Sequence, residues 1–518
     1  MAENLSPVNW PKRRPRAPGV AKLYLGVLLV FLTTYSLTCQ RGPAWQDSGV
    51  FQWRILHFDL VGWLGLALSH PLLILLGKAF SYVPLGPLAW RMNWVSAVFG
   101  SLAVANVAVL VRRLVPARPL AAWFSAGLFG LAHTVWWLST ICESQAILAA
   151  FFTAELNVLL SLIRRPRAAI ALLLGGLNGL ALTAHNLALP ATAVYGLVVV
   201  GLCLRRRLGW HALALLIASW AVGAAGLLVL VAHEAGSVGL AAAVQSALFG
   251  RGWRSHVLAG SFRAVPLGVG YVVCNFPNAG LPLAAAGLGG LRAGSPRALR
   301  WAFAGLAAVY LLFAIRYPVP DQFMFFLPFY AMVAVLAGVG FGRVAAGRRS
   351  WLASAALGSV LLGPALYAVL PPLVRATGLP LPGRKDLPFR DPARYWLSPW
   401  KGAEDSADRF ARAVLARVSA DGVVIADSTS RYPLLWTQAV RGLRGRPAVL
   451  GLAEATKENL PVGTPNVFVV SRARGYYPAW LSERASLAKD SDGSILFRVV
   501  WRDARGHRPG SPAGKAGR

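Results

Sequence analysis

Ionisable side chains stand beside the ends of apolar segments in this sequence, where a membrane surface would lie. The first is Asp47, in Trp45-Gln46-Asp47-Ser48-Gly49, which follows an apolar run ending at residue 39. A carboxylate in this place can serve as a general base that takes the proton of an acceptor hydroxyl. An Asp beside Ser-Gly can equally cap a helix or a turn. Asp47 is therefore a candidate catalytic residue with a structural alternative.

Four further polar residues occupy similar positions. His70 lies inside an apolar segment, and Glu143, His185 and Asn186 follow later ones. A polar or ionisable group at membrane depth, such as Glu143, is costly unless water or a partner reaches it, which makes these residues candidates for substrate binding. The alternatives are an interfacial polar group for His70 and a hairpin turn or helix cap for His185 and Asn186.

Arginines near the last candidate acid could bind a phosphate group. Arg316 precedes Asp321 in Arg316-Tyr317-Pro318-Val319-Pro320-Asp321, and Arg254 lies in the predicted outer loop 233–263. A guanidinium offers forked donors that match phosphate oxygens. Arg316 could instead form a structural ion pair with Asp321.

The apolar segments that position these residues predict membrane-spanning helices. A helix needs about 20 apolar residues to cross a hydrocarbon core of about 30 Å. The segment 61–80 is interrupted by His70, Pro71 and Lys78, so we interpret it as an interfacial or re-entrant piece. About eleven spans remain, which predicts a polytopic α-helical membrane protein: 22–39, 92–111, 120–139, 146–163, 168–185, 187–204, 210–232, 264–288, 299–315, 323–342 and 351–371.

Basic residues in the connections predict the orientation of the spans. If residues 1–21 are cytoplasmic, five basic connections (112–119, 164–167, 205–209, 289–298 and 343–350) also fall inside. The loop 40–91 and all the candidate residues then lie on the outer face. They describe a cavity that opens outward beside the membrane. Such a cavity suits a lipid-linked anionic substrate whose chain stays in the bilayer.

The composition agrees with this class. Hydrophobic residues make up 56% of 518 residues, against roughly 45–50% in soluble domains. The net charge of +32 could indicate nucleic-acid binding. However, many basic residues lie in short clusters between apolar runs, so we ascribe the charge to topology. The four cysteines are isolated and imply neither a disulfide framework nor a zinc site.

The composition changes after Pro371. Residues 372–504 are expected to form a soluble extracytoplasmic α/β domain, with an amphipathic helix at 404–418 and buried strands at 423–426 and 467–470. Residues 505–518, rich in Gly, Pro and Arg, are expected to be a disordered tail.

Several stretches together resemble the family of domain of unknown function 2723, which includes the transmembrane protein 260 type O-mannosyltransferases and belongs to the C-type glycosyltransferase fold group. The resemblance covers most of the chain, in order. The matching stretches are Trp45 to Phe51 (family W-x-D-S-G-E-F), Ser69-His70-Pro71-Leu72 (part of H-P-P-G-Y-P-L), Arg91 to Gly100 (R-x-N-x-x-S-A-x-x-G), Glu143, Leu182 to Asn186, and Ala426 to Gln438.

The resemblance implies a glycosyltransferase that uses a polyprenyl-phosphate sugar. Asp47 would be the base of an inverting transfer to a hydroxyl of a protein, glycan or lipid. Arg254 or Arg316, chosen from topology alone, would stabilise the leaving phosphate. Val50 replaces the family's acidic residue, which leaves open a divalent metal, a different substrate or a loss of activity.

Two other functions remain open. A flippase or transporter of lipid-linked glycans would be expected to show internal repeats and charges at the midplane of the membrane, and neither is evident here. A non-catalytic membrane scaffold is compatible with the change at Val50. The Ala, Gly, Arg and Leu bias suggests a GC-rich bacterial genome, and hence the plasma membrane of a bacterium.

Overall fold

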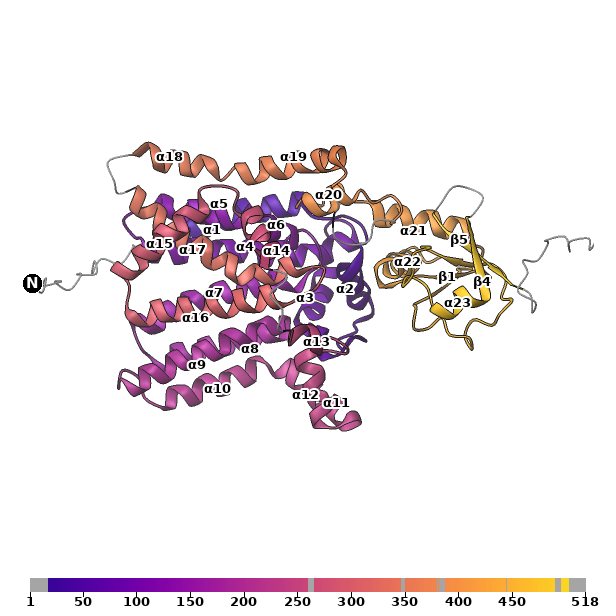
Figure 1. Cartoon of the computed structure of the whole chain (residues 1–518). Coiled ribbons are helices and arrows are strands. Elements are labelled where there is room, and N and C mark those ends of the chain that lie inside the picture. Colours follow the sequence, from indigo (N-terminus) through magenta and orange to yellow (C-terminus); the bar gives the residue numbers. More distant parts are fainter. Residues whose placement is uncertain are drawn as a thin grey trace, which may run out of the picture.

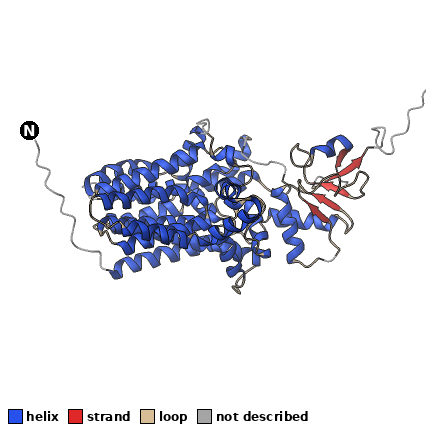
Figure 2. Cartoon of the chain, turned by 90° about the horizontal axis from the view of Figure 1, so that it is seen from below, coloured by secondary structure: helices blue, strands red, loops and turns tan. Residues whose placement is uncertain are grey.

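The computed structural model describes residues 17–259, 265–345, 350–379, 381, 387–443, 445–489 and 495–502. The predicted tail 505–518 and most of the predicted cytoplasmic N-terminus 1–21 lie outside the described residues. The helical part and the strands are separate in space: all the strands lie at one end of the molecule, beyond the end of the helix bundle (Figures 1 and 2).

The chain up to residue 377 is helical. Its elements are α1 (Ala17–Thr38), α2 (Gln46–His57), η1 (Leu66–Leu68), α3 (Pro71–Ser81), α4 (Leu88–Leu114), α5 (Pro119–Gly130), α6 (His133–Leu138), α7 (Ser144–Arg164), α8 (Ala168–Ala184), η2 (Asn186–Ala188), α9 (Leu189–Leu204), α10 (His211–Gly223), α11 (Ala225–Val238), α12 (Leu240–Phe249), α13 (Arg254–Val257), α14 (Val265–Asn275), α15 (Gly280–Gly294), α16 (Arg297–Arg316), η3 (Gln322–Phe326), α17 (Leu327–Val344), α18 (Ser350–Ser359) and α19 (Leu362–Thr377).

The predicted polytopic membrane fold is confirmed. Within the described ranges, seven helical segments are long and apolar enough to cross a membrane, and the bent pair α10–α11 raises the number to eight. The other three predicted spans fall on shorter elements: 168–185 on the 17-residue α8, 120–139 on α5 with α6, and 264–288 on α14 with α15. The segment 61–80 forms no single long helix but η1 and α3, which are separated at His70.

Two glycines set the close packing of α15 against α17. A Cβ added at Gly287 would lie 1.9 Å from the Leu336 carbonyl oxygen, and one at Gly340 would lie 1.9 Å from that of Leu283. Small residues allow such backbone approach between membrane helices.

We therefore expect Gly287→Ala to destabilise the bundle by about 1–3 kcal/mol, because the extra methyl group must force the two helices apart. The matched control is Gly294→Ala in the same helix, where an added Cβ meets nothing within 4 Å. Thermal unfolding in detergent measures both variants. Equal stability of the two would contradict close packing at Gly287.

The C-terminal part forms a small α/β domain. It contains α20 (Pro392–Leu397), α21 (Ser406–Arg417), β1 (Val423–Ile425), α22 (Ser428–Val440), β2 (Ala448–Leu450), β3 (Val467–Val469), α23 (Ala479–Arg484), β4 (Ala485–Lys489) and β5 (Phe497–Trp501). The sheet order is β2-β1-β3-β5-β4; β1 is parallel to β2 and β3, and β5 is antiparallel to β3 and β4.

The predicted helix and both predicted strands coincide with α21, β1 and β3. The predicted apolar stripe of the helix supplies Phe410, Val414 and Val418 to the buried core, and Leu415 is partly buried against it. The register Val424↔Val449 and Val424↔Phe468 places β1 in the centre of the parallel part. This core fixes α22 on the side of the domain that meets the helix bundle.

Candidate active site

A cavity of about 550 Å³ lies where the bundle meets the C-terminal domain. Six of the eight predicted site residues line it: Asp47, His70, Glu143, His185, Asn186 and Asp321. The C-terminal domain contributes Tyr395 and Trp396 from α20 and Ser428 and Thr429 from α22. The cavity thus combines residues that are hundreds of positions apart in the sequence.

The first turn of α2 is held by a polar network. The backbone N–H of Ala44 donates to Gln52 Oε1 (2.9 Å), Gln52 Nε2 donates to Asn93 Oδ1 (2.9 Å), and Asn93 Nδ2 donates to the Gln40 carbonyl (2.8 Å). Gly49 allows the turn to close, because a Cβ there would lie 2.2 Å from the Ala44 oxygen. The network fixes the start of α2, and with it Asp47, against α4.

Asp47 projects into the cavity. Its side chain is open to the cavity, and desolvation by the protein that encloses the cavity raises the pKa of the carboxyl. Within the part of the chain that the structure describes, the carboxylate has no side-chain hydrogen bond or ion pair, so the helix-capping alternative does not hold here. A carboxylate with free oxygens and a raised pKa is suited to accept a proton from a substrate.

Glu143 is buried beside Asp47. Ser48 Oγ donates to Glu143 Oε1 (2.8 Å), and the Glu143 backbone N–H donates to Ser96 Oγ (3.0 Å). Burial raises the pKa of Glu143 well above its usual range, and the negative charge of Asp47 raises it further. The Glu143 carboxylate is therefore held to α2 through Ser48, whereas the Asp47 carboxylate bonds to no other described residue.

Asp321 is the third carboxylate of the cavity. Burial, and then the charge of Asp47, raises its pKa to about 7. A raised pKa means that the folded state binds the proton more tightly than the unfolded state. The contribution of the protonated Asp321 carboxyl to the free energy of unfolding is therefore lost as the pH rises from about 4 to 7.

We expect Asp321→Asn to stabilise the protein at pH 8, by about 1–3 °C in thermal midpoint, and to have less effect at pH 5. Asp421→Asn should show the opposite sign, because hydrogen bonds from Ser419 and Asn466 lower the pKa of that exposed carboxyl. Thermal unfolding across pH 5–8 measures both variants. A pH-independent Asp321→Asn effect would contradict the raised pKa.

Among the residues that the structure describes, six helical segments begin at the cavity, and each presents its N-terminus there. They are α2, α3, α7, η2 with α9, η3 with α17, and α22; the lining residues Gln46, His70, Glu143, Asn186, Asp321 and Ser428 lie at or next to their starts. The N-terminus of a helix carries a partial positive charge and free N–H groups. The convergence of these N-termini favours the binding of an anionic ligand, in a cavity that also contains the three carboxylates.

His70 and His185 form a stacked pair with ring centroids 5.0 Å apart. His70 Nδ1 lies 2.8 Å from the Ala184 carbonyl, so this nitrogen carries the proton and Nε2 is the acceptor. His185 Nδ1 accepts from the Leu187 backbone N–H (3.0 Å), which leaves the proton on Nε2. His185 thus caps η2, as the structural alternative proposed, and it also lines the cavity.

The two predicted phosphate-binding arginines do not line the cavity. Arg316 Nη2 and Nε both donate to the Ala259 carbonyl (2.7 and 3.0 Å), and Arg254 is exposed with its guanidinium 6.0 Å from the Phe249 ring centroid. Among the described residues no ion pair joins Arg316 to Asp321 either. Arg316 instead ties the end of α16 to the chain after α13, because an arginine at a helix end finds backbone carbonyls nearby.

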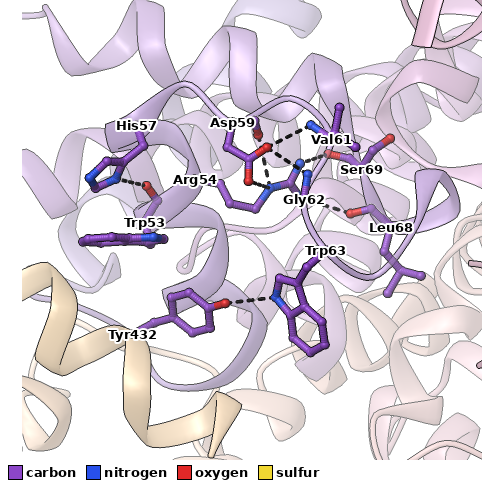
Figure 3. Close-up of polar contacts among 10 residues, drawn as sticks. All are labelled: Trp53, Arg54, His57, Asp59, Val61, Gly62, Trp63, Leu68, Ser69 and Tyr432. Carbon is purple, nitrogen blue, oxygen red and sulfur yellow. Dashed lines mark hydrogen bonds and ion pairs between the residues drawn. The ribbon is translucent and has the colours of Figure 1, made fainter. Parts of the chain in front are cut away.

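Arg54 also lines the cavity, although the sequence did not identify it. Figure 3 shows its contacts with residues 59–69. Its buried guanidinium donates to the carbonyls of Asp59 (3.2 Å), Leu68 (3.1 Å) and Ser69 (2.7 Å) and pairs with the Asp59 carboxylate (3.7 Å). These bonds hold residues 59–69, which we call the strap, over α2. The available signal was its spacing of seven from Asp47, which places both on one face of a helix.

No group of three or more His, Cys, Asp or Glu side chains in the described ranges is arranged to hold a metal ion. Val50, the departure from the family pattern, lines the cavity as an apolar side chain. The groups of the cavity lining that can act on a ligand include carboxylates, imidazoles and the N–H groups of helix N-termini.

The fold has known counterparts among solved structures. It is similar to ArnT from Cupriavidus metallidurans bound to undecaprenyl phosphate, with a TM-score of 0.59, 16% identity, and coverage of 93% of this chain and 98% of that one. The apo structure of the same ArnT gives a TM-score of 0.57 at the same identity and coverage. No family model and no curated protein matches the chain. The similarity shows the fold of a C-type glycosyltransferase in an integral membrane protein.

Proposed function

We propose that this chain is a membrane glycosyltransferase that moves a sugar from a polyprenyl-phosphate donor to an acceptor hydroxyl, with inversion at the anomeric carbon. The observation that carries the proposal is the free carboxylate of Asp47 in a cavity between an apolar helix bundle and a polar domain. The similar fold of ArnT, whose structure holds undecaprenyl phosphate, supports the choice of donor.

The lining of the cavity suits an amphipathic donor. Apolar side chains from η2, α9, α12, α13 and α16 line one side, namely Leu187, Leu189, Pro190, Leu248, Phe249, Val257 and Phe313. A prenyl chain can lie along this side, while its phosphate meets the N-termini of α3 and η2. The His185 Nε2–H can donate to a phosphate oxygen there. This arrangement replaces the arginines that the sequence suggested.

The transfer follows from the position of the base. The acceptor hydroxyl loses its proton to Asp47 as its oxygen attacks the anomeric carbon from the face opposite the phosphate. The bond between the anomeric carbon and the phosphate oxygen breaks, and its electron pair leaves with the phosphate. The helix N-termini and the His185 N–H stabilise the charge that develops on this oxygen. Asp47 then returns its proton to solvent.

We further propose the plasma membrane of a bacterium as the location, with the C-terminal domain outside the cytoplasm. The orientation rests on the basic connections, which all fall on one side when residues 1–21 are cytoplasmic. A transporter is less well supported, because the polar groups gather at the end of the bundle nearest the C-terminal domain.

The test is consumption of undecaprenyl-phosphate sugars by the purified protein in detergent, with undecaprenyl phosphate measured as the product. We expect release of undecaprenyl phosphate from at least one sugar ester and saturable binding of undecaprenyl phosphate itself. Binding without any turnover would favour the transporter, and neither binding nor turnover would favour the scaffold.

A further inference from the structure

The cavity has a second, polar side that the donor does not need. Gln46, Arg54, Ser428 and Thr429 line this side, and they come from α2 and α22. The two helices pack against each other where the bundle meets the C-terminal domain (Figure 1). Asp47 belongs to the first turn of α2, so the base stands next to this polar side.

Hydrogen bonds from the start of α2 and from the strap join the helix bundle to the C-terminal domain. Trp45 Nε1 donates to Ser406 Oγ (2.7 Å), and the Tyr395 hydroxyl donates to Gln46 Oε1 (3.1 Å). Trp63 Nε1, in the strap, donates to the Tyr432 hydroxyl on α22 (2.9 Å; Figure 3). These bonds fix the position of α22 relative to Asp47, so the polar side of the cavity is held in a defined geometry.

The hydroxyls on this wall are available to a ligand. Ser428 is exposed and Thr429 is half-buried, and neither hydroxyl donates or accepts a hydrogen bond in the described part of the chain. Both side chains line the cavity, so their hydroxyls can exchange bonds to water for bonds to a ligand. Gln46 uses its oxygen for Tyr395, and its amide N–H groups donate to no other described residue.

We propose that a water-soluble saccharide acceptor enters along the seam between α2 and α22, and that Ser428, Thr429 and Gln46 bind the hydroxyls next to the one that Asp47 activates. This inference rests on the proposed function. Hydroxyl and amide groups beside an aromatic ring suit a sugar, and Trp63, which also lines the cavity, is 53% exposed. An acceptor lipid would need the apolar side, which the donor chain occupies.

The experiment separates transfer from hydrolysis of the donor by water. Ser428→Trp fills the polar side, and Ser482→Trp makes the same change at an exposed position of α23 outside the cavity. Transfer to methyl α-mannoside, release of undecaprenyl phosphate without acceptor, and binding of undecaprenyl phosphate are measured. Ser428→Trp is expected to lower transfer about 10-fold to 100-fold and to lower hydrolysis and undecaprenyl phosphate binding much less.

Thr429→Val guards against a folding defect, because it removes one hydroxyl and keeps the shape. We expect a higher KM for the saccharide with donor hydrolysis unchanged. Equal loss of transfer and hydrolysis in folded Ser428→Trp, or unaltered transfer in both variants, would overturn the proposal. So would a wild-type protein that transfers only to a lipid or a peptide, or that only hydrolyses its donor. Absence of any donor binding and turnover would instead overturn the proposed function.

Discussion

Asp47→Asn is expected to reduce sugar transfer by roughly 10²–10⁴-fold, the usual contribution of a positioned general base. Asparagine has nearly the same shape, and Asp47 makes no side-chain hydrogen bond within the described residues, so the fold of α2 should not change. Undecaprenyl phosphate binding should therefore persist. The measurement is the initial rate of transfer with the same donor and acceptor for both proteins.

The pH profile gives a second, independent sign of the base. Burial raises the pKa of Asp47. As the pH is lowered, wild-type transfer should therefore begin to fall at a higher pH than the ordinary aspartate pKa of about 3.9 would give, because Asp47 becomes protonated. The residual activity of Asp47→Asn should lack this acid limb. Asp405→Asn, an exposed carboxylate on the C-terminal domain that pairs with Arg409, is the matched control. Full activity of Asp47→Asn would remove it as the base.

Much of the candidate site could be predicted because the ends of apolar segments define one membrane face. Asp47, Glu143 and Asp321 each follow or precede such a segment, and the structure brings them into one cavity. The same reasoning places Arg254 and Arg316 on that face, but it does not tell whether their side chains line the cavity. Their side chains turn to Phe249 and to the Ala259 carbonyl instead.

Hydropathy could not predict where a helix breaks within an apolar segment. The predicted span 120–139 is interrupted between α5 and α6. There the Tyr367 hydroxyl accepts from the His133 backbone N–H (3.1 Å), and Asn275 Oδ1 accepts from that of Thr134 (2.8 Å). These distant side chains satisfy the free N–H groups of α6, so a helix can restart inside the protein. Local apolarity does not reveal such partners.

The position of the strap and its contact with the C-terminal domain could not be predicted from the sequence either. Arg54 acts through backbone carbonyls, which any residue supplies, so no sequence pattern marks its partners. Trp63 meets Tyr432 across 369 residues, a pairing that depends on the docking of two separately formed parts. Function here depends on contacts between parts, whereas the sequence reports mainly on each part alone.

Arg54→Lys should disable the site even though the charge is kept. A lysine lacks the fork that reaches the carbonyls of Leu68 and Ser69 together. Buried carbonyls left without a donor cost about 1–3 kcal/mol each. The strap then loosens directly before His70, whose ring is stacked on His185. A displacement of about 1 Å at a substrate-positioning group is enough to lower kcat/KM by about 100-fold.

Limited proteolysis within residues 59–69 and steady-state transfer rates test this expectation together. Arg54→Lys should be cleaved faster than wild type and should lose activity, and the two effects should appear in the same preparation. The control is Arg409→Lys, which makes the same exchange in an exposed pair with Asp405 and should change neither readout. Wild-type resistance and activity in Arg54→Lys would mean that a single positive charge, and not the geometry of the guanidinium, holds the strap over Asp47.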